Sequence, residues 1–544
     1  MTADILEPGR TCWRKERATR LAVLVDAAPY FRTLREAMLR AREAIYLIGW
    51  DFDLRIEMLP GEGDDDGMAP DGHPNRLGDF IRALVDERDV DLHILKWDGA
   101  MLAALGSQVL PTIWMEFFAG SNIHFALDSH HPVGACHHQK IVVIDDDMAF
   151  CGGIDVTTDR WDTPEHAPDD PRRHRPDGEP FGPWHDATTA VEGPVAAALG
   201  DLARERWERA TGDELEPPRA AGGTVWPDDL DAHMRDVTVA IARTRPRYHE
   251  EPLVNEIEQL YIAAIEAAQH SIYLESQYLA AGTICAALEE RLGESDPPEI
   301  VVVNPRNAES FMEDEAMHSV RARMIERLED ADHANRFRVL YPANAAGEPI
   351  YVHAKVLIVD GAILRVGSSN VDNRSLGFDT ECDVALVANT DGEREAVRAL
   401  RDRLMAEHMG CEPEDVREAG AGGSILAALD RLNGRAERRL EPIEAEPLDP
   451  LERALADTRL FDPRYRPKPK ERVKHAVKRG IAPYHVEAVA GLGALVAVTA
   501  AGLAAWGGYR LVRRAIDGPR RERRLAAPAI VTDGRVRPAP RRDA

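Results

Sequence analysis

Short apolar runs alternate with amphipathic runs through most of the chain. VDLHILKWD (residues 90–98) and EIVVVNP (299–305) have the length and composition of buried strands. Between such runs, apolar residues recur at helical spacing, as they do from Asn75 to Asp89. Strands that alternate with helices in this way predict an α/β fold whose sheet is covered on both faces.

An internal repeat divides this pattern into two parts. HQKIVVIDDDMAFCGGID begins at His138 and HAKVLIVDGAILRVGSSN begins at His353, so the copies match at an offset of 215 residues. A second pair lies upstream: AREAIYLIGWDFD from Ala41 and AQHSIYLESQYLA from Ala268 each read as a helical run that passes into a strand. A repeated segment is one structural unit used twice. We therefore predict two pseudo-symmetric α/β halves, each with a mostly buried β-sheet flanked by helices.

The pattern changes after Gly434. A charged stretch punctuated by prolines comes first, and 22 residues without a charge, from Ala488 to Tyr509, are then long enough to span a bilayer. We interpret this run as a transmembrane helix, with a helix packed on the body as the alternative. The predicted segments are a first half (1–211), a second half (212–434), a basic Pro-containing linker (435–487), the transmembrane helix (488–509) and a basic tail (510–544).

A long polar stretch, from Thr157 to Trp184, follows the first repeat. It is rich in Pro, Asp and Arg and has no hydrophobic period, so it predicts a loop. Loops of this length are usually lids, binding loops or linkers. Two interpretations stay open: a lid that contacts the substrate, or a passive insertion.

Charge is unevenly distributed. The net charge is −27, but from Phe461 onward 19 Lys and Arg stand against 7 Asp and Glu, so this stretch carries +12 and the rest −39. An acidic body argues against a nucleic-acid partner, whereas a basic tail suits an anionic membrane surface. The six cysteines lack the spacing of a zinc site or disulfide framework, and the N-terminus lacks a secretory signal pattern. We expect a cytoplasmic body, associated with a membrane through a C-terminal single-span or peripheral anchor.

The chemistry of the repeat lies in its first three residues. Residues i and i+2 of a strand share a face, so His138 points with Lys140, and His353 with Lys355. If the halves pack about a twofold axis, the two faces converge on one site. One imidazole can then attack phosphorus, the other can protonate the leaving oxygen, and the lysines can neutralise the phosphoryl oxygens. This chemistry needs no metal or other cofactor, but it needs histidine pKa values that are pushed apart.

The alternative is that two duplicated strands merely share a packing pattern. Packing explains the apolar positions of both copies. It does not explain two His–Lys pairs on strand faces, each followed by a Gly-rich turn (CGGID and VGSSN) that can present N–H groups to an anion.

The paired motifs resemble those of the phospholipase D superfamily, the HKD enzymes, over Leu21 to Met409. HAKVLIVD, GSSNVDNRS and a downstream acid are similar to the family pattern in the second half. HHQKIVVID, GGID and WHDATTAVEGP resemble the phospholipid-acting branch, which includes plant and bacterial phospholipases D. IYLESQY (residues 272–278) is similar to a segment of that branch, with Ser276 where the branch has Asn.

The resemblance implies a role for each matching residue. His138 would be the nucleophile and His353 the general acid and base. Each histidine would have its own lysine and its own orienting acid, Asp186 for the first motif and Glu381 for the second. Binding of the substrate phosphate falls to the following side chains: Lys140, Lys355, Asn370 and Ser368, with Asp155 as a further candidate.

Three polar residues of the motifs need a separate interpretation. Asp145 and Asp360 lie at odd offsets from their histidines, so we interpret them as structural acids that end each strand. Asp155 stands where some family members carry Asn, and an acid there repels an anion unless it is paired. His137 points to the opposite strand face and is interpreted as a neighbour with its own partner.

Four functions are compatible with these motifs. The first is a phospholipase D or transphosphatidylase that acts on a phospholipid at a membrane surface, with water or a small alcohol as acceptor. The others are a cardiolipin synthase-like transferase, a nuclease or other phosphodiesterase, and a non-catalytic membrane scaffold. The acidic body favours a lipid over a nucleic acid. Headgroup, acceptor and oligomeric state stay open.

Overall fold

The computed structural model describes residues 5–99, 122–219, 223–307, 311–420 and 422–444. All of its described elements belong to one compact unit. Within these described ranges, no helix is long and apolar enough to cross a membrane. The predicted transmembrane helix (488–509), the basic tail (510–544) and most of the predicted linker lie outside the described residues.

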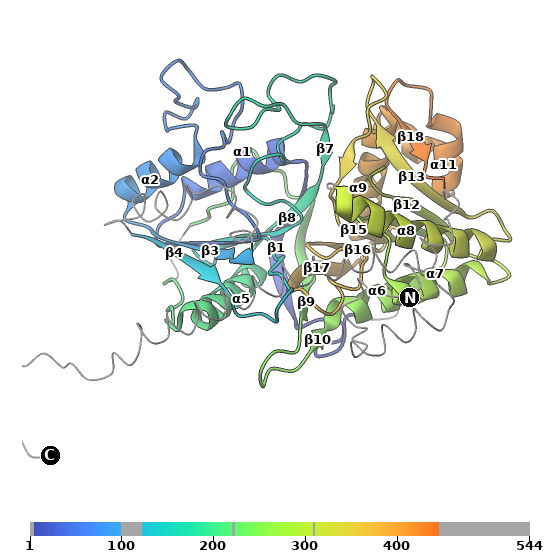
Figure 1. The fold of residues 1–544 in the computed structure, drawn as a ribbon, viewed down its shortest axis with the longest axis horizontal. Coiled ribbons are helices and arrows are strands. Elements are labelled where there is room, and N and C mark those ends of the chain that lie inside the picture. Colours follow the sequence, from blue (N-terminus) through green and yellow to red (C-terminus); the bar gives the residue numbers. More distant parts are fainter. Residues whose placement is uncertain (1–4, 100–121, 220–222, 308–310, 421, 445–544) are drawn as a thin grey trace, which may run out of the picture. The chain divides into compact units, whose positions relative to one another are not determined.

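Sixteen of the described strands form one large mixed sheet around two central strands (Figure 1). β1 (Arg14–Val25) and β9 (Met234–Arg245) pair antiparallel at its centre. Beyond β1 come β8 (Ala187–Glu192), β6 (Met148–Gly152), β5 (Ile141–Ile144), β2 (Ala44–Gly49), β3 (Asp91–Trp97) and β4 (Ile123–Asp128). Beyond β9 come β17 (Glu381–Val387), β16 (Ile363–Gly367), β15 (Val356–Val359), β11 (Ser271–Glu275), β12 (Glu299–Val303), β13 (Phe337–Ala343) and β18 (Arg439–Pro442), while β10 (Val254–Asn255) pairs with β9.

The two sides of the sheet follow the same plan. Outward from the centre, each side has antiparallel strands and then a parallel triplet, β2–β3–β4 on one side and β11–β12–β13 on the other. The last strand, β18, adds antiparallel to β13. The parallel triplets contain the runs that the sequence predicts as buried strands, and all five residues of β12 are buried.

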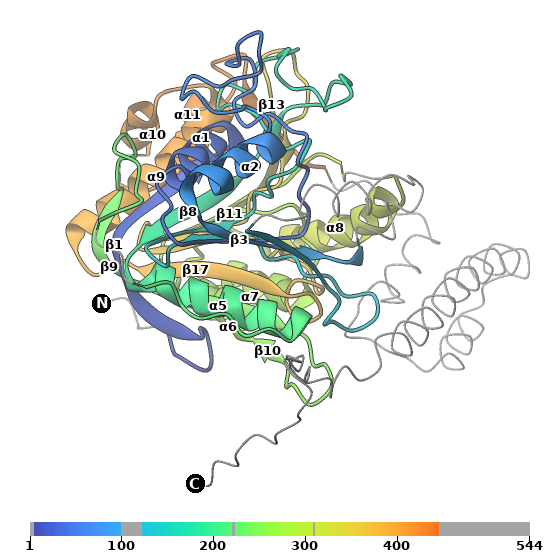
Figure 2. The ribbon, with the colours of Figure 1, turned by 90° about the vertical axis from the view of Figure 1, so that its left-hand side faces the viewer.

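Helices cover both faces of the sheet (Figure 2). The first half contributes α1 (Ala27–Met38), α2 (Leu77–Arg88) and α5 (Pro194–Thr211), and the second α6 (Glu256–Ala267), α7 (Gly282–Leu292), α8 (Phe311–Ala331), α9 (Asp391–Met409), α10 (Pro413–Ala419) and α11 (Ile425–Leu432). Successive side chains of β1 pack alternately on the two faces of the sheet. Leu21 and Val23 belong to a core shared with α5 and α9, whereas Ala22 and Leu24 belong to a core shared with α1 and α2. A third core packs α6 and α7 on the second half.

The sequence correctly predicts the α/β class with a large buried sheet, and two details differ. Separate sheets were expected in the two halves, but β1 and β9 join all of these strands into one. The linker predicted from residue 435 begins with sheet structure, because Leu440 and Ile443 bury their side chains where β18 pairs with β13. The division at 211/212 stays a prediction.

The structural acids Asp145 and Asp360 close matching turns after β5 and β15. Both have left-handed backbones, with φ values of 54° and 55°. The Asp145 carboxylate accepts from three successive backbone N–H groups, those of residues 42–44, at 2.8–2.9 Å. The Asp360 carboxylate accepts from those of residues 269–271, at 2.7–2.8 Å. Each carboxylate thus holds the start of the neighbouring strand, β2 or β11.

Candidate active site

The two motif histidines meet where the halves join. Their ring centroids are 6.4 Å apart. Each motif is held by the backbone of the other half: the N–H of His138 donates to the carbonyl of Thr380 at 2.9 Å, and the N–H of His353 donates to that of His185 at 2.7 Å. A short parallel pair, β7 (Trp184–His185) with β14 (Tyr351–Val352), leads directly into His353. The convergence expected from the repeat is therefore present.

The histidines lie just before their strands and not within them. β5 begins at Ile141 and β15 at Val356, after the lysine of each motif. The backbone of Lys140 already joins the sheet, because its carbonyl accepts from Gly152 N–H at 3.4 Å, and its side chain lies close enough to His138 for its charge to lower the pKa of that ring, which burial lowers most. Each strand thus begins a few residues later than the sequence predicts, and the histidine and lysine of each motif still lie close together.

Each histidine is paired with an acid from the other half, which corrects the expected assignment. His138 Nδ1 lies 3.1 Å from both carboxylate oxygens of Glu381, and His353 Nδ1 lies 2.6 Å from Asp186 Oδ2. The sequence assigns Asp186 to the first motif and Glu381 to the second. The pairing is crossed because β8 and β17, which begin at or next to these acids, flank the central pair β1–β9.

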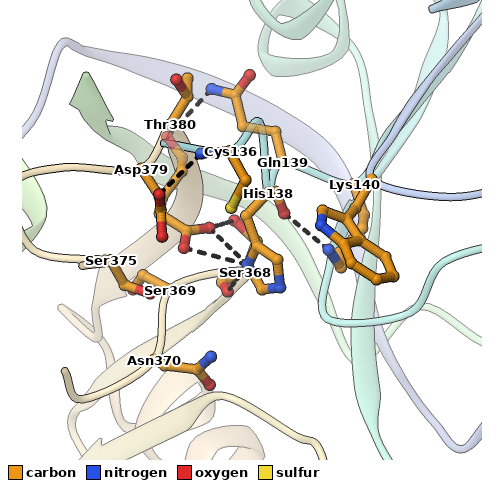
Figure 3. A network of polar contacts seen from close by, with 12 residues as sticks. Cys136, His138, Gln139, Lys140, Ser368, Ser369, Asn370, Ser375, Asp379 and Thr380 are labelled. Atoms are coloured by element: carbon orange, nitrogen blue, oxygen red, sulfur yellow. Dashed lines mark hydrogen bonds and ion pairs between the residues drawn. The ribbon is translucent and has the colours of Figure 1, made fainter. Parts of the chain in front are cut away.

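Ser368 fixes the tautomer of His138. The Ser368 carbonyl lies 3.0 Å from His138 Nδ1, and a carbonyl can only accept, so Nδ1 carries the hydrogen. Nε2 of the neutral ring therefore keeps its lone pair. The Ser368 hydroxyl donates to Glu381 at 2.5 Å, which places it on the orienting acid and not on a phosphate position. In Figure 3, His138 lies between Ser368 and Lys140.

The two lysines are buried beside the histidines. Lys140 Nζ donates to the carbonyl of His138 at 2.8 Å and lies 3.1 Å from Asp155 Oδ2, so the acid in doubt is paired. Lys355 Nζ donates to the carbonyl of His353. Asn370, at the position that matches Asp155, donates to Gln277 at 3.2 Å, and within the described part of the chain its buried Oδ1 has no hydrogen-bond partner. The lysines are the groups that can donate to a phosphate here, whereas this amide oxygen can only accept a hydrogen bond.

The electrostatics of the site keep both rings neutral. Burial, and then the charges of Lys140 and Lys355, hold the pKa of His138 well below its usual range. Burial and the charge of Lys355 do the same to the pKa of His353. Burial also raises the pKa of Glu381 to about 8 and lowers the pKa of Lys355 to about 7. The histidine pKa values are thus both lowered, and not separated as expected, because both rings are buried and both lie near the same two lysines.

The long loop contributes residues that the sequence does not single out. Arg160 is buried, and its guanidinium lies 4.2 Å from the ring centroid of Trp184. The Trp184 ring in turn lies 5.2 Å from that of His353. The charge of Arg160 is a further cause of the lowered pKa of His353, after burial and the charge of Lys355. No periodic signal marks Arg160, because an irregular loop carries it. The loop therefore forms a wall of the site.

His137 and the glycine turn complete the surroundings. His137 lies 3.0 Å from Asp128 and 3.1 Å from the Thr380 hydroxyl, so it has its own partners as interpreted. Gly153 packs so closely on Asp186 that a Cβ atom at this position would collide with the carboxylate. The GGID turn is thus small because the acid that holds His353 lies against it.

Comparison with known proteins gives matches in both halves. A family model described as phospholipase D matches residues 37–219, and one described as cardiolipin synthase, PLD-like domain, matches residues 261–403. Phospholipase D alpha 1 of Nicotiana tabacum is 22% identical over 515 residues, covering 69% of this chain and 63% of that protein. The homonymous protein of Arabidopsis thaliana is 22% identical over 557 residues, covering 76% of this chain and 67% of its own length.

Among solved structures, a phosphatidylserine synthase of Haemophilus influenzae matches with a TM-score of 0.47 and 11% identity, covering 71% of this chain and 86% of that chain. The match with the tobacco protein covers 63% of the length of that relative, which is less than two thirds. The first family model includes the motif at His138, and the second includes the motif at His353. The chain belongs to the phospholipase D superfamily.

Proposed function

We propose that this protein cleaves or exchanges phospholipid headgroups at a membrane surface through a covalent phosphohistidine. The observation that carries the proposal is the pair of histidines with centroids 6.4 Å apart, each held at Nδ1 by a buried acid and accompanied by a buried lysine. Two imidazoles that face one phosphorus can act as nucleophile and as proton donor. The phospholipid substrate is supported by the phospholipase D names of the matching family model and relatives.

In the first step, His138 Nε2 attacks phosphorus and the bond to the leaving alcohol breaks. The leaving oxygen takes a proton from His353 Nε2. Asp186 stabilises positive charge on His353, and positive charge that develops on His138 favours the ionised form of Glu381, which then stabilises that ring in the same way. In the second step, His353 takes a proton from water or an alcohol as its oxygen attacks phosphorus, and the phosphorus–nitrogen bond breaks. Lys140 and Lys355 neutralise the phosphoryl oxygens in both transition states.

Substrate binding supplies the protonation state that this sequence of steps requires. In the free site both rings are neutral. A bound phosphodiester adds a negative charge between them, which raises the pKa of both rings and opposes the effect of the lysines. The ring beside the leaving oxygen then carries the proton. The acid–base assignment thus depends on the substrate and not on the free site alone.

A cardiolipin synthase-like transferase is the second candidate. The family model that matches residues 261–403 carries that description. In such a reaction, the acceptor is the hydroxyl of a second phospholipid instead of water. The chemistry at phosphorus is the same, so only the products separate the candidates.

The products of a lipid assay test this proposal. The protein is incubated with vesicles of phosphatidylcholine and phosphatidylglycerol and with a primary alcohol, and the lipids are followed by mass spectrometry. We expect phosphatidic acid and phosphatidyl-alcohol, and cardiolipin if the second candidate holds. His138→Ala is the control and gives none. Cleavage of a nucleic-acid diester without any lipid product contradicts the proposal.

The division of roles between the histidines needs a separate trap. With an activated phosphodiester, whose leaving group needs no proton, His353→Ala still forms phosphohistidine on His138, whereas His138→Ala forms none. Intact-mass and peptide mapping at alkaline pH locate the adduct. An adduct on His353 reverses the assignment.

A further inference from the structure

A second cluster of histidines and acids lies behind the candidate active site. Four of its side chains point at one another: Asp26 before α1, His166 in the long loop, His185 in β7 and Glu407 in α9. All four residues are buried. Their oxygen and nitrogen atoms all lie within 4.8 Å of one another. The cluster is separate from the proposed reaction centre, although His185 is the neighbour of Asp186 in the chain.

The distances within the cluster fit a single small cation. His185 Nδ1 lies 2.8 Å from Glu407 Oε1 and 3.2 Å from Asp26 Oδ1. His166 Nε2 lies 3.3 Å from the same Glu407 oxygen and 3.7 Å from Asp26 Oδ2. Ligand atoms around a tetrahedral zinc ion, bonded at about 2.0–2.2 Å, are separated by about 3.4 Å.

The outward-facing nitrogen of each ring is already engaged. His166 Nδ1 lies 2.9 Å from Asp162 Oδ2, and His185 Nε2 lies 3.0 Å from Glu275 Oε2. If these nitrogens donate to the carboxylates, the inward nitrogens carry lone pairs. A carboxylate on the far nitrogen is the usual support of a metal-bound histidine, because it fixes the tautomer and the ring orientation.

With both rings in that tautomer, the interior of the cluster brings acceptors together. With the rings protonated, His166 Nε2 donates to Glu407 Oε1 at 3.3 Å, and the carboxylates of Asp26, Asp162 and Glu407 favour this form because they raise the pKa of His166 to about 9 against the effect of burial. Asp26 Oδ2 and His185 Nδ1 are buried and have no hydrogen-bond partner among the residues that the structure describes. Two neutral imidazoles and two carboxylates carry a charge of −2, which a divalent ion balances. Buried charged groups require such compensation. The other way to balance the cluster is to protonate both rings.

We propose that Asp26, His166, His185 and Glu407 bind one zinc ion with a structural role. Two imidazole nitrogens and two carboxylate oxygens are ligands that zinc accepts, and four protein ligands close the site against a reacting water. The ion joins the long loop and β7 of the first half to α9 of the second. This departs from the sequence expectation of no metal. Spacing could not reveal the site, because its ligands are spread from residue 26 to residue 407.

Metal content and stability test the proposal without reference to lipid activity. The full chain is purified without chelators, and first-row metals are quantified by inductively coupled plasma mass spectrometry. We expect one zinc ion per chain. Stripping with a chelator should lower the melting temperature and added zinc should restore it. Replacement by Co²⁺ should give the visible absorption of a tetrahedral site.

Matched variants locate the ion. His166→Ala should lose the zinc, whereas His93→Ala, which removes a buried histidine stacked on His124 elsewhere in the fold, should keep it. Asp162→Asn keeps all four ligands and removes one outer carboxylate, so it should weaken zinc affinity about 10- to 100-fold.

The wild-type chain decides the outcome even if His166→Ala fails to fold. Metal-free protein whose melting temperature does not respond to zinc or cobalt overturns the proposal, and protonated histidines then balance the cluster. Zinc that stays bound in a folded His166→Ala variant also overturns it. A zinc-loaded protein without lipid products contradicts the proposed function alone.

Discussion

Lys355 shows how far burial alters a single residue in this site. Its side chain is buried, and burial lowers its pKa to about 7, so near neutral pH the free site contains this lysine partly without charge. A phosphodiester that binds beside it favours the charged form and draws in a proton. Binding of substrate and protonation of Lys355 are therefore linked.

This linkage predicts that the affinity for a non-hydrolysable short-chain phosphodiester falls as pH rises above 7. Only the protonated lysine binds the anion well, so the affinity should drop by up to about tenfold per pH unit. Isothermal titration calorimetry in two buffers of different ionisation enthalpy should show uptake of about one proton at pH 8. Lys355→Arg, which stays charged, should remove the share of the uptake that Lys355 contributes and leave that of the imidazole, whereas Lys140→Arg should leave both. Affinity that is constant across this range contradicts the role of Lys355.

At the residue scale, the sequence identifies which side chains matter but not how they pair. His138, Lys140, His353 and Lys355 repeat at one offset, and that repetition is visible without a structure. The partner of each histidine is not visible, because it depends on contacts about 170 to 240 residues apart in the chain. Arg160 escapes notice for a related reason: its neighbours come from tertiary packing and not from any local pattern.

Among the elements, the turns after β5 and β15 are the closest equivalents between the halves. Both place an aspartate in the left-handed region and present its carboxylate to three N–H groups. Their surroundings differ. The N–H of Ala44 bonds to Asp145 in a buried setting, whereas the N–H groups of Gln269 and His270 bond to Asp360 at the exposed surface. Water can replace a lost partner at the second turn but not fully at the first.

These turns predict unequal losses of stability. Asp145→Ala should lower the free energy of unfolding by about 2–4 kcal/mol, because it leaves the buried N–H of Ala44 without an acceptor and puts alanine, whose side chain cannot hydrogen-bond locally, at a positive φ. Asp360→Ala should cost less. Asp145→Asn, which tolerates the left-handed region and keeps one acceptor, is the matched control and should fall between wild type and Asp145→Ala. Urea unfolding measures all three, and equal losses at both turns contradict this reading of burial.

The elements that the sequence predicts well are those with a strong local pattern. The helix expected from Asn75 to Asp89 is α2, and the two apolar runs are β3 and β12. The sequence places β18 in the linker, because its four residues, RLEP, are too few and too polar to show the alternation of a strand. Its strand conformation comes from the edge of β13, which offers hydrogen bonds to whatever segment lies beside it.

For the whole molecule, the seam between β1 and β9 decides how the halves depend on each other. The two strands pair from Arg14–Ile241 to Leu21–Met234. One hydrophobic core also runs through both halves on one face. A half expressed alone would expose this strand edge and part of that core to water, and such an edge invites aggregation. The sequence could not reveal the seam, because strand order is a property of tertiary packing.

We predict that the fragments 1–219 and 223–466 are each insoluble when expressed alone. Expressed together, they should form a soluble complex, because pairing of β1 with β9 covers both edges. Co-purification and the lipid assay measure recovery, with His138→Ala in the first fragment as the inactive control. A soluble, monomeric single fragment with native-like circular dichroism contradicts this dependence.

The crossed pairs of histidine and acid also constrain how such a duplicated protein can evolve. Since His138 relies on Glu381 and His353 relies on Asp186, neither copy of the repeat carries a complete set of its own. A substitution of the acid in one copy therefore impairs the histidine of the other copy, and selection acts on both copies together. The two copies can diverge in loops and surface helices, but the residues at their junction can change only together.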